Sequence, residues 1–297
     1  VPIFADCLSG IRFGFNSKYI FSHYHFYLNK MTIPELIIRF GKKPNSKKLN
    51  EFLDTHRKKV ILFDPVGRFN DDAGHIHSYS VLQIPIIQIH PKNSEYINAV
   101  TRLESAFINE LDTEKNEFME KNIFRFLFDK LPNESYLFIG NSMPIRNVDN
   151  FVTTHQKKIF TIGNRGASGI DGVISSALGM ALLNSNLHNI LIIGDVSFAH
   201  DLSALQIAKQ NDIPLIIIVI NNSGGQIFNK LPYAEFGIKK FEKFWITNPE
   251  LNINKTAELF GFEYQFIDNM ENLENFEVED RKIIEVKLST QFLKKRL

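Results

Sequence analysis

The chain has 297 residues, with 34 Lys and Arg against 33 Asp and Glu, and 44% of its residues are hydrophobic. This length predicts about two domains, the balanced charge argues against a nucleic-acid-binding tail, and no apolar run approaches the roughly 18 residues that cross a membrane. The single cysteine, Cys7, excludes an intrachain disulfide framework, and we expect a buried thiol in a cytoplasmic protein.

The first part of the chain alternates short apolar runs with helical patterns. Runs bounded by Asp, Gly or Pro predict strands over residues 1–5, 36–40, 60–63 and 84–89. Residues 46–56 predict a helix with Leu49, Phe52 and Leu53 on one face. Residues 94–130 also predict helix, interrupted by a charged, solvent-facing stretch at 109–117. We therefore predict a first domain over residues 1–110, a linker over 111–120 and a second domain over 121–297.

The second part of the chain is more regular. Apolar runs predict strands over residues 136–139, 158–162, 190–193, 215–220, 263–266 and 282–287. Asp171 and Ser197 are each predicted to cap a helix. The inner face of the helix after Asp171 carries Ile174, Ala177, Leu178 and Ala181. The inner face of the helix after Ser197 carries Phe198, Leu202, Leu205 and Ala208. Strand and helix alternation predicts an α/β fold: doubly wound parallel sheets with helices on both faces, in two domains of which the first is incomplete.

Polar loops follow four of the predicted strands in the second domain. They occupy residues 140–146, 163–171, 194–197 and 221–225 and contain Gly, Asn, Ser, Arg or Asp. The carboxyl ends of parallel strands lie at one edge of a sheet, where open α/β proteins bind ligands. Ordinary turn chemistry explains one such loop easily and four less easily. The pattern therefore predicts a ligand site at this edge.

Two of these loops carry a specific pair of side chains, Asp195 and Asn222, which lie 27 positions apart. If their strands are neighbours, the strands run roughly 4.8 Å apart and the two side chains converge. A carboxylate, an amide oxygen and a backbone carbonyl of the glycine turn suit Mg²⁺, with phosphate oxygens completing the shell. A helix beginning after Ser197 would point free N–H groups at the same phosphates. The sequence thus predicts a Mg²⁺–diphosphate site.

The pair of motifs also resembles the thiamine-diphosphate signature of the decarboxylase superfamily. The fuller loops are Gly140-Asn-Ser-Met-Pro-Ile-Arg146, Asn164-Arg-Gly-Ala-Ser-Gly-Ile-Asp-Gly172, Gly194-Asp-Val-Ser-Phe-Ala-His-Asp-Leu202 and Asn221-Asn-Ser-Gly-Gly-Gln-Ile-Phe228. With the segments 5–12, 37–46 and 64–68, they closely resemble the MenD family, the 2-succinyl-5-enolpyruvyl-6-hydroxy-3-cyclohexene-1-carboxylate synthases of menaquinone biosynthesis. The resemblance covers essentially the whole chain, as a middle domain and a diphosphate-binding domain.

This resemblance implies a transferase that decarboxylates 2-oxoglutarate on thiamine diphosphate and adds the succinyl carbanion to isochorismate. It makes Asp195, Asn222 and the Gly224 carbonyl the ligands of Mg²⁺, with Mn²⁺ as an alternative. It places Ser142 and Ser197 at the diphosphate. The family's apolar wedge, which holds the cofactor bent, matches Ile170.

The resemblance also implies residues for the substrates. Ile227 and Phe228 match apolar residues beside the reacting centre. Arg146 and Arg165 match residues that bind substrate carboxylates, and the chemistry agrees, because both substrates are polyanions and arginine binds carboxylates through two hydrogen bonds. For the full-length protein we expect a homodimer or homotetramer.

One feature of the family has no counterpart here. Family members carry an amino-terminal domain whose Glu activates the aminopyrimidine ring, and no carboxylate of this sequence matches it. We expect the chain to open inside the middle domain and, taken alone, to be inactive.

Other interpretations remain open. A related 2-oxoacid enzyme resembling acetolactate synthase would keep the cofactor and need fewer cationic residues. A non-catalytic binding or regulatory module would keep only the fold. The segment 71–77 is expected to be a solvated loop rather than a metal cluster, and His200 a surface residue near a helix amino terminus.

Overall fold

The computed structural model describes residues 1–64, 71, 73, 75–78, 94–232, 234, 240–279 and 281–288. The chain forms two compact units, one of residues 1–6 and 17–113 and the other of residues 7–16 and 114–297. The predicted strand at 84–89 lies outside the described residues. Among the described residues, no helix combines the length and apolar character needed to cross a membrane.

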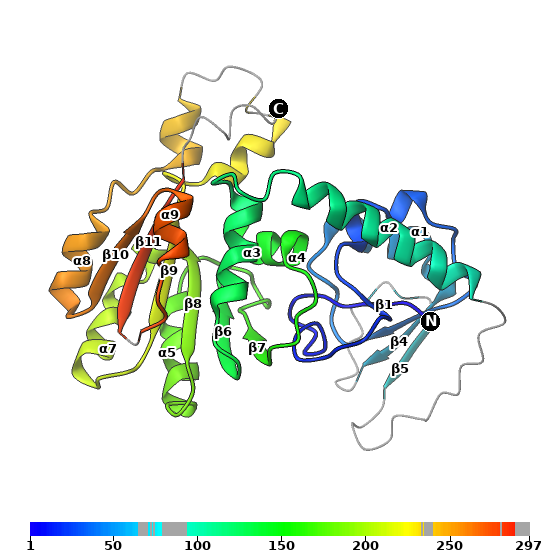
Figure 1. Cartoon of the computed structure of the whole chain (residues 1–297), viewed down its shortest axis with the longest axis horizontal. Helices are drawn as coiled ribbons and strands as arrows, with labels where there is room; N and C mark the ends of the chain where they lie inside the picture. Colours follow the sequence, from blue (N-terminus) through cyan, green and yellow to red (C-terminus); the bar gives the residue numbers. More distant parts are fainter. Residues whose placement is uncertain are drawn as a thin grey trace. The chain divides into compact units, whose positions relative to one another are not determined.

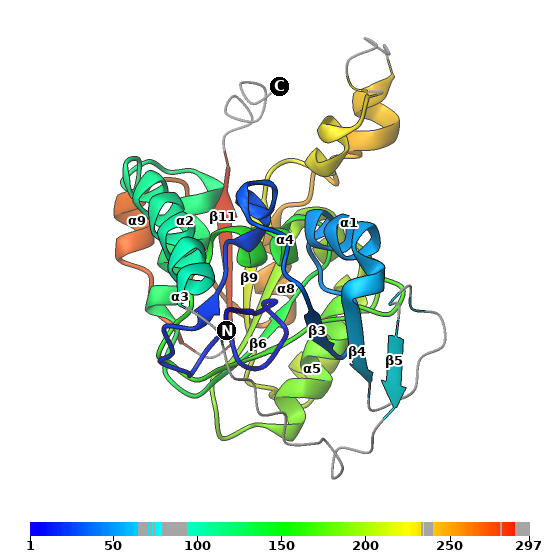
Figure 2. The same cartoon turned by 90° about the vertical axis from the view of Figure 1, so that its right-hand side faces the viewer.

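The first unit contains two small parallel sheets. β1 (Ile3–Phe4) pairs with β2 (Ile20–Phe21), and β3 (Ile37–Phe40), β4 (Val60–Asp64) and β5 (His75–Ser78) lie side by side in that order (Figure 2). Two α-helices, α1 (Lys47–Thr55) and α2 (Glu95–Asp112), and three 3-10 helices, η1 (Tyr24–Phe26), η2 (Leu28–Lys30) and η3 (Arg57–Lys59), complete the described elements. The Ser46 hydroxyl accepts a hydrogen bond from the Leu49 amide at 3.2 Å, as an N-cap does. The predicted helix over 46–56 is therefore confirmed.

Part of the segment expected to be a solvated loop is a strand. His75–Ser78 forms β5 and pairs in parallel with the last four residues of β4. Asp71 forms an ion pair with Arg39 and also accepts a hydrogen bond from the Ala73 amide at 3.0 Å. Sheet pairing to β4 is a long-range contact, so the local polar composition did not indicate it.

A buried carboxylate, Glu104 of α2, ties two parts of the first unit together. It accepts hydrogen bonds from the amide and hydroxyl of Ser22, both at 3.0 Å, from His23 Nδ1 at 2.9 Å and from the Tyr27 hydroxyl at 2.7 Å. Burial opposes ionisation, but these contacts outweigh it and lower the pKa of Glu104 to about 2. The carboxylate therefore fastens the chain after β2 to α2.

The second unit is built on a six-stranded parallel sheet with the order β10-β11-β9-β8-β6-β7 (Figure 1). Its strands are β6 (Ser135–Ile139), β7 (Ile159–Ile162), β8 (Asn189–Gly194), β9 (Ile216–Asn221), β10 (Glu263–Ile267) and β11 (Lys282–Lys287). Each coincides with a predicted strand to within about one residue at either end, so the apolar runs are confirmed as the sheet.

Helices cover both faces of this sheet. One face packs against α3 (Glu120–Lys130), α4 (Met143–Phe151) and α9 (Met270–Glu274), and the other against α5 (Val173–Leu183), α7 (Leu205–Gln210) and α8 (Ile253–Phe260). The side chains of β8 alternate between the two faces. Ile190 and Ile192 belong to the hydrophobic core on the first face, and Leu191 and Ile193 belong to the core on the second. The described structure thus confirms the α/β class, with helices on both faces of a parallel sheet.

Two predicted helix caps are wrong. The N-cap of α5 is Gly172, in the left-handed region at φ 64°, and the carboxylate that binds the first turn is Asp201, which accepts from the Ser175 amide at 2.8 Å. The helix predicted after Ser197 begins earlier, as α6 (Asp195–His200), and Ser197 lies inside it. The Ser197 hydroxyl instead donates to the Ile170 carbonyl at 2.6 Å. Contacts distant in sequence replaced the local caps.

The predicted helical segment 94–130 is two helices, because α2 ends at Asp112 and α3 begins at Glu120. The charged stretch at 109–117 therefore begins as the last turn of α2. Residues 113–119 connect the two helices, and the first compact unit ends at Thr113.

Within the second unit, residues 7–16 are bound to α4 by a fully buried arginine, Arg12. Its guanidinium donates to the Asp149 carboxylate at 2.9 Å and to the carbonyl oxygens of Val148, Asp149 and Val152. The Cys7 amide donates to the same carboxylate at 3.1 Å, and the Cys7 thiol is buried, as predicted. A cation at the carboxyl end of a helix is favourably placed toward the helix dipole.

Candidate functional site

The four polar loops lie at the carboxyl edge of the six-stranded sheet, and hydrogen bonds join them to one another. Asn141, after β6, binds the loop after β7; Ser197, after β8, binds Ile170 of that loop; and Asp195 binds Gly224 of the loop after β9. Three interactions thus connect four segments that are far apart in the sequence. The predicted convergence of these loops is present in the structure.

Asn141 is the centre of the first connection. Its side chain is buried, and Nδ2 donates to the carbonyl oxygens of Asn164 at 3.0 Å and Gly169 at 2.6 Å. Its Oδ1 accepts from Arg165 Nη1 at 2.8 Å. Asn141 therefore fixes the shape of the second loop and the direction of the Arg165 guanidinium.

Asp195 lies where β8 meets α6, beside the loop after β9. β8 and β9 are neighbours with Gly194 paired to Ile220, so the condition under which Asp195 and Asn222 were predicted to converge is met. The Asp195 carboxylate accepts from the Gly224 amide at 2.7 Å and from the Val196 amide at 2.9 Å. These bonds set the side chain against the glycine turn.

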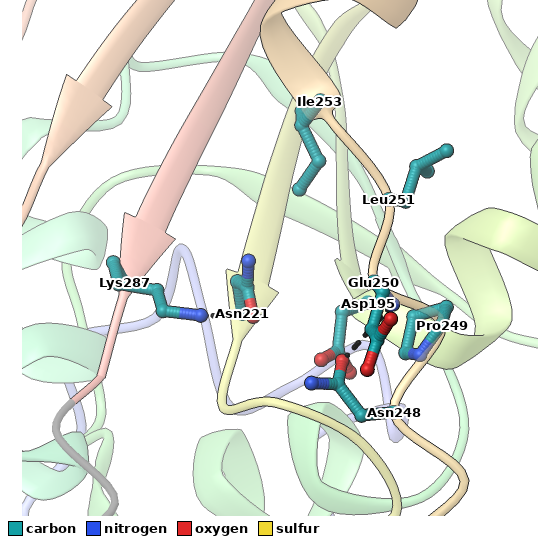
Figure 3. Close-up of a pocket in the computed structure, with 8 residues that line it drawn as sticks. All are labelled: Asp195, Asn221, Asn248, Pro249, Glu250, Leu251, Ile253 and Lys287. Carbon is teal, nitrogen blue, oxygen red and sulfur yellow. Dashed lines mark hydrogen bonds between the residues drawn. The ribbon is translucent and has the colours of Figure 1, made fainter.

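The Asp195 carboxylate is 5% exposed, and burial raises its pKa to about 6, against the two backbone hydrogen bonds and the charge of Lys287. Among the described residues, no lysine, arginine or histidine forms an ion pair with it. It lines a cavity of about 90 Å³ together with Asn248 and Glu250, while Lys287 and Asn221 lie together at the other side (Figure 3). A buried carboxylate without an ion-pair partner among the described residues is suited to bind a cation.

The other two members of the predicted metal set fit that reading. Asn222 is 6% exposed, and its side chain makes no hydrogen bond within the described part of the chain. Gly224, the next residue but one, follows Ser223 in a turn that is bound to Asp195. A carboxylate, an uncommitted amide and a turn carbonyl are the hard oxygen donors that Mg²⁺ prefers.

Only glycine fits at position 224. Its φ is 111°, and a Cβ there would lie 2.3 Å from the Ile246 carbonyl oxygen. Gly225 is nearly as confined, because its Cβ would lie 2.9 Å from the Trp245 carbonyl oxygen. The glycine pair therefore allows residues 245–246 to pack directly on the turn.

The two arginines of the predicted substrate site are near each other, although they come from different loops. Arg146 lies in the first turn of α4, and Arg165 lies in the loop after β7. Desolvation, and then the charge of Arg165, lower the pKa of the Arg146 guanidinium. Two cations held close together form a site for an anion such as a carboxylate.

The remaining predicted cofactor residues lie at the same edge. Ser142, the N-cap of α4, has φ 70° and ψ −124°, an unusual backbone conformation for serine, and its carbonyl accepts from Arg146 Nη1 at 2.6 Å. Ile170 and Ser197 are joined by their hydrogen bond of 2.6 Å. These residues are therefore grouped, and their roles toward a cofactor remain proposals.

Ile227 and Phe228 lie in η6 (Gln226–Lys230), directly after the glycine pair. The Phe228 ring meets the Trp245 ring edge to face, with centroids 5.5 Å apart, and Trp245 belongs to the π-helix η8 (Glu242–Ile246). The sequence interpretation named Phe228 but not Trp245, because the two segments meet only in the folded chain.

His200 is the last residue of α6, at its carboxyl end and exposed, so the expected position near a helix amino terminus is wrong. Two further polar residues near this edge, Asn141 and Lys287, were also not identified from the sequence. Asn141 belongs to the first polar loop but had no predicted role, and Lys287 was predicted only as the last residue of a strand.

The chain is also similar in sequence to known proteins. The family described as "Thiamine pyrophosphate enzyme, C-terminal TPP binding domain" matches residues 146–281. The chain is 37% identical over 281 residues to a protein of Bacillus pumilus. The matched region covers 89% of this chain and 48% of the relative. It is 35% identical over 291 residues to one of Listeria welshimeri, covering 92% of this chain and 50% of the relative. Both relatives are named 2-succinyl-5-enolpyruvyl-6-hydroxy-3-cyclohexene-1-carboxylate synthase, and the chain spans about half of their length.

Proposed function

Since the chain is homologous to the MenD-family synthases, we propose that it is the part of such an enzyme that holds the diphosphate and the metal of thiamine diphosphate. The match to the thiamine pyrophosphate enzyme domain and the similarity to the two relatives support this proposal. The observation that carries the proposal is the buried Asp195 carboxylate bound to the Gly224 amide, beside an uncommitted Asn222. In this proposal Asp195, Asn222 and the Gly224 carbonyl hold Mg²⁺, or Mn²⁺ as an alternative.

The other polar groups of this edge would hold the diphosphate. Ser142 and Ser197 would lie at the diphosphate, and Ile170 would support the cofactor from its apolar side. Ile227 and Phe228 would form the apolar surface next to the reacting centre, and the Trp245 ring packs edge to face against Phe228. When bound, thiamine diphosphate supplies the electron sink that allows a 2-oxoacid to lose carbon dioxide.

The proposed reaction removes carbon dioxide from 2-oxoglutarate and adds the remaining four-carbon unit to isochorismate. Both substrates carry more than one carboxylate, and Arg146 and Arg165 provide a paired cationic surface for them. The fixed hydrogen bond from Arg165 to Asn141 orients one guanidinium before substrate arrives. Preorganisation of this kind lowers the ordering cost of binding.

In a full-length form of this enzyme, Arg146→Ala and Arg165→Ala are expected to weaken use of the two substrates about tenfold to over a hundredfold. The loss of a charge-assisted hydrogen bond costs about 1.5–3 kcal/mol, while cofactor affinity should stay near the wild-type value. Steady-state kinetics with each substrate varied in turn measures the effect, and Arg281→Ala, at an exposed ion pair with Asp212, is the matched control. Wild-type kinetics in both variants would favour a monocarboxylate enzyme resembling acetolactate synthase.

The 297-residue chain alone is expected not to turn over 2-oxoglutarate, even with saturating cofactor and Mg²⁺. No carboxylate in these residues matches the Glu that activates the ring in the family, and acid–base help of this type contributes about 10²–10⁴-fold. Carbon dioxide release from the purified chain is the assay, with the Asp195→Ala variant as the blank. Addition of a separately produced amino-terminal half is expected to restore part of the activity. Robust turnover by the chain alone would show that one of its own carboxylates replaces that Glu.

A further inference from the structure

The turn after β9 has a strained backbone. Ser223 and Gly224 both have positive φ, 62° and 111°, and a serine in the left-handed region is uncommon. Glycine tolerates this conformation, but Ser223 must be held in it by contacts with its surroundings. The same turn carries Asn222 and Gly224 to Asp195, so whatever holds Ser223 also fixes the proposed metal site.

Lys287, the last residue of β11, makes these contacts. Its Nζ donates to Ser223 Oγ at 2.9 Å and to Asn221 Oδ1 at 3.0 Å. Asn221 Oδ1 also accepts from the Ser223 amide at 3.1 Å. The register of β11 with β9 pairs Lys287 with Asn221, which places the lysine where the turn leaves the sheet (Figure 3). We call Lys287, Asn221 and Ser223 the lysine clamp.

The orientation of the Asn221 amide is fixed from the opposite side. Asn221 Nδ2 donates to Glu285 Oε1 at 2.6 Å, and Glu285 Oε2 accepts from the Tyr264 hydroxyl at 2.7 Å. Glu285 is 8% exposed, two residues before Lys287 on the same strand. Because the amide nitrogen is bound to Glu285, the amide oxygen faces Ser223 and Lys287.

Lys287 does not neutralise Asp195 directly. Among the described residues no ion pair joins the two, and the Asp195 carboxylate is bound by backbone amides instead. The lysine is engaged with two oxygens of the clamp, so the carboxylate remains open to a metal ion.

We propose that Lys287 is a positioning residue: by binding Asn221 Oδ1 and Ser223 Oγ it holds residues 221–224 in the shape that presents Asn222 and Gly224 to Asp195. This inference rests on the proposed cofactor site, since it assigns Lys287 a role in building that site. The lysine touches neither metal nor substrate in this account.

The first test needs no ligand. Amide hydrogen exchange is measured in the wild-type chain and in Lys287→Met, Lys287→Arg and Lys282→Met. In Lys287→Met the amides of Ser223 and Gly224 are expected to exchange at least tenfold faster, with the sheet amides unchanged. Lys287→Arg, which keeps a charged donor, should recover part of the protection. Lys282→Met, at the other end of β11, should leave both amides as in the wild type.

The second test measures binding of thiamine diphosphate by the same variants in Mg²⁺. The dissociation constant of Lys287→Met is expected to rise tenfold or more, and that of Lys282→Met to stay near the wild-type value. Wild-type exchange at Gly224 together with wild-type affinity in Lys287→Met would overturn the proposal. If the wild-type chain binds no cofactor, the proposed function fails while the exchange experiment still decides the role of Lys287. Should Lys287→Met not fold, Ser223→Ala removes one contact of the clamp and is expected to accelerate exchange at Gly224.

Discussion

Replacing Asp195 with alanine is expected to abolish Mg²⁺-dependent binding of thiamine diphosphate by a full-length form of this enzyme. In the proposed site Asp195 is the single anionic protein ligand, and a hard cation such as Mg²⁺ depends on carboxylate oxygen. The substitution also removes the acceptor of the Gly224 amide, 2.7 Å away, so the glycine turn loses its hydrogen bond to the start of α6. Calorimetric titration of cofactor into both proteins at fixed Mg²⁺ measures the loss. Unchanged affinity would disprove the site assignment.

The matched variant Asp195→Asn removes the charge of the side chain and keeps its shape. Folding raises the pKa of Asp195 from 3.8 to about 6, so the metal-free folded protein holds the proton more tightly than the unfolded chain. The stability of the metal-free wild type should therefore fall as pH rises from about 4 to 6, by up to about 3 kcal/mol, and then level off. Asp195→Asn should lack this fall. Mg²⁺ requires the ionised carboxylate, so its affinity for the wild type should decrease about tenfold per pH unit below pH 6.

Replacing Arg12 with methionine is expected to destabilise the second unit by about 3–5 kcal/mol. The substitution leaves the Asp149 carboxylate buried without its cation, and it removes the donor to three carbonyl oxygens around the end of α4. α4 also carries Arg146 and begins after Ser142, so cofactor affinity should fall with stability. Urea unfolding monitored by circular dichroism measures the change.

Two variants control this experiment. Arg281→Met breaks a surface pair with Asp212 and should cost at most about 1 kcal/mol. Arg12→Met combined with Asp149→Leu removes both charges and should recover part of the loss, because the buried carboxylate is no longer left unpaired. Equal stability of Arg12→Met and the wild type would contradict the role given to Arg12.

The sheet and its ligand edge were predictable because their signals are local. β8 and β9 are unbroken apolar runs buried on both faces, and each ends at the polar residues that the sequence analysis named. The predicted metal site depended on the condition that the two strands are neighbours, and the pairing of β8 with β9 meets it. The clustering of four polar loops then required only that the strands be parallel.

The errors and omissions depend on contacts between distant segments. Ser197 was expected to cap a helix, but its hydroxyl donates a hydrogen bond to the carbonyl of Ile170, which lies 27 residues earlier in the loop after β7. Asp171 was expected to cap α5, a task that Asp201 performs from 26 residues beyond Ser175. Lys287 reaches Ser223 across a strand pairing that no local pattern indicates. The division into domains and the roles of individual site residues remain predictions.

The most direct test of the proposed cofactor site is titration of thiamine diphosphate into the wild-type chain, once with Mg²⁺ and once with a chelator. Trp245, the sole tryptophan, packs against Phe228 beside the glycine turn and reports binding through its fluorescence. We expect a saturable change in emission with Mg²⁺ and none with the chelator. Equal responses in both conditions, or no response with Mg²⁺ while calorimetry also detects no heat, would contradict it.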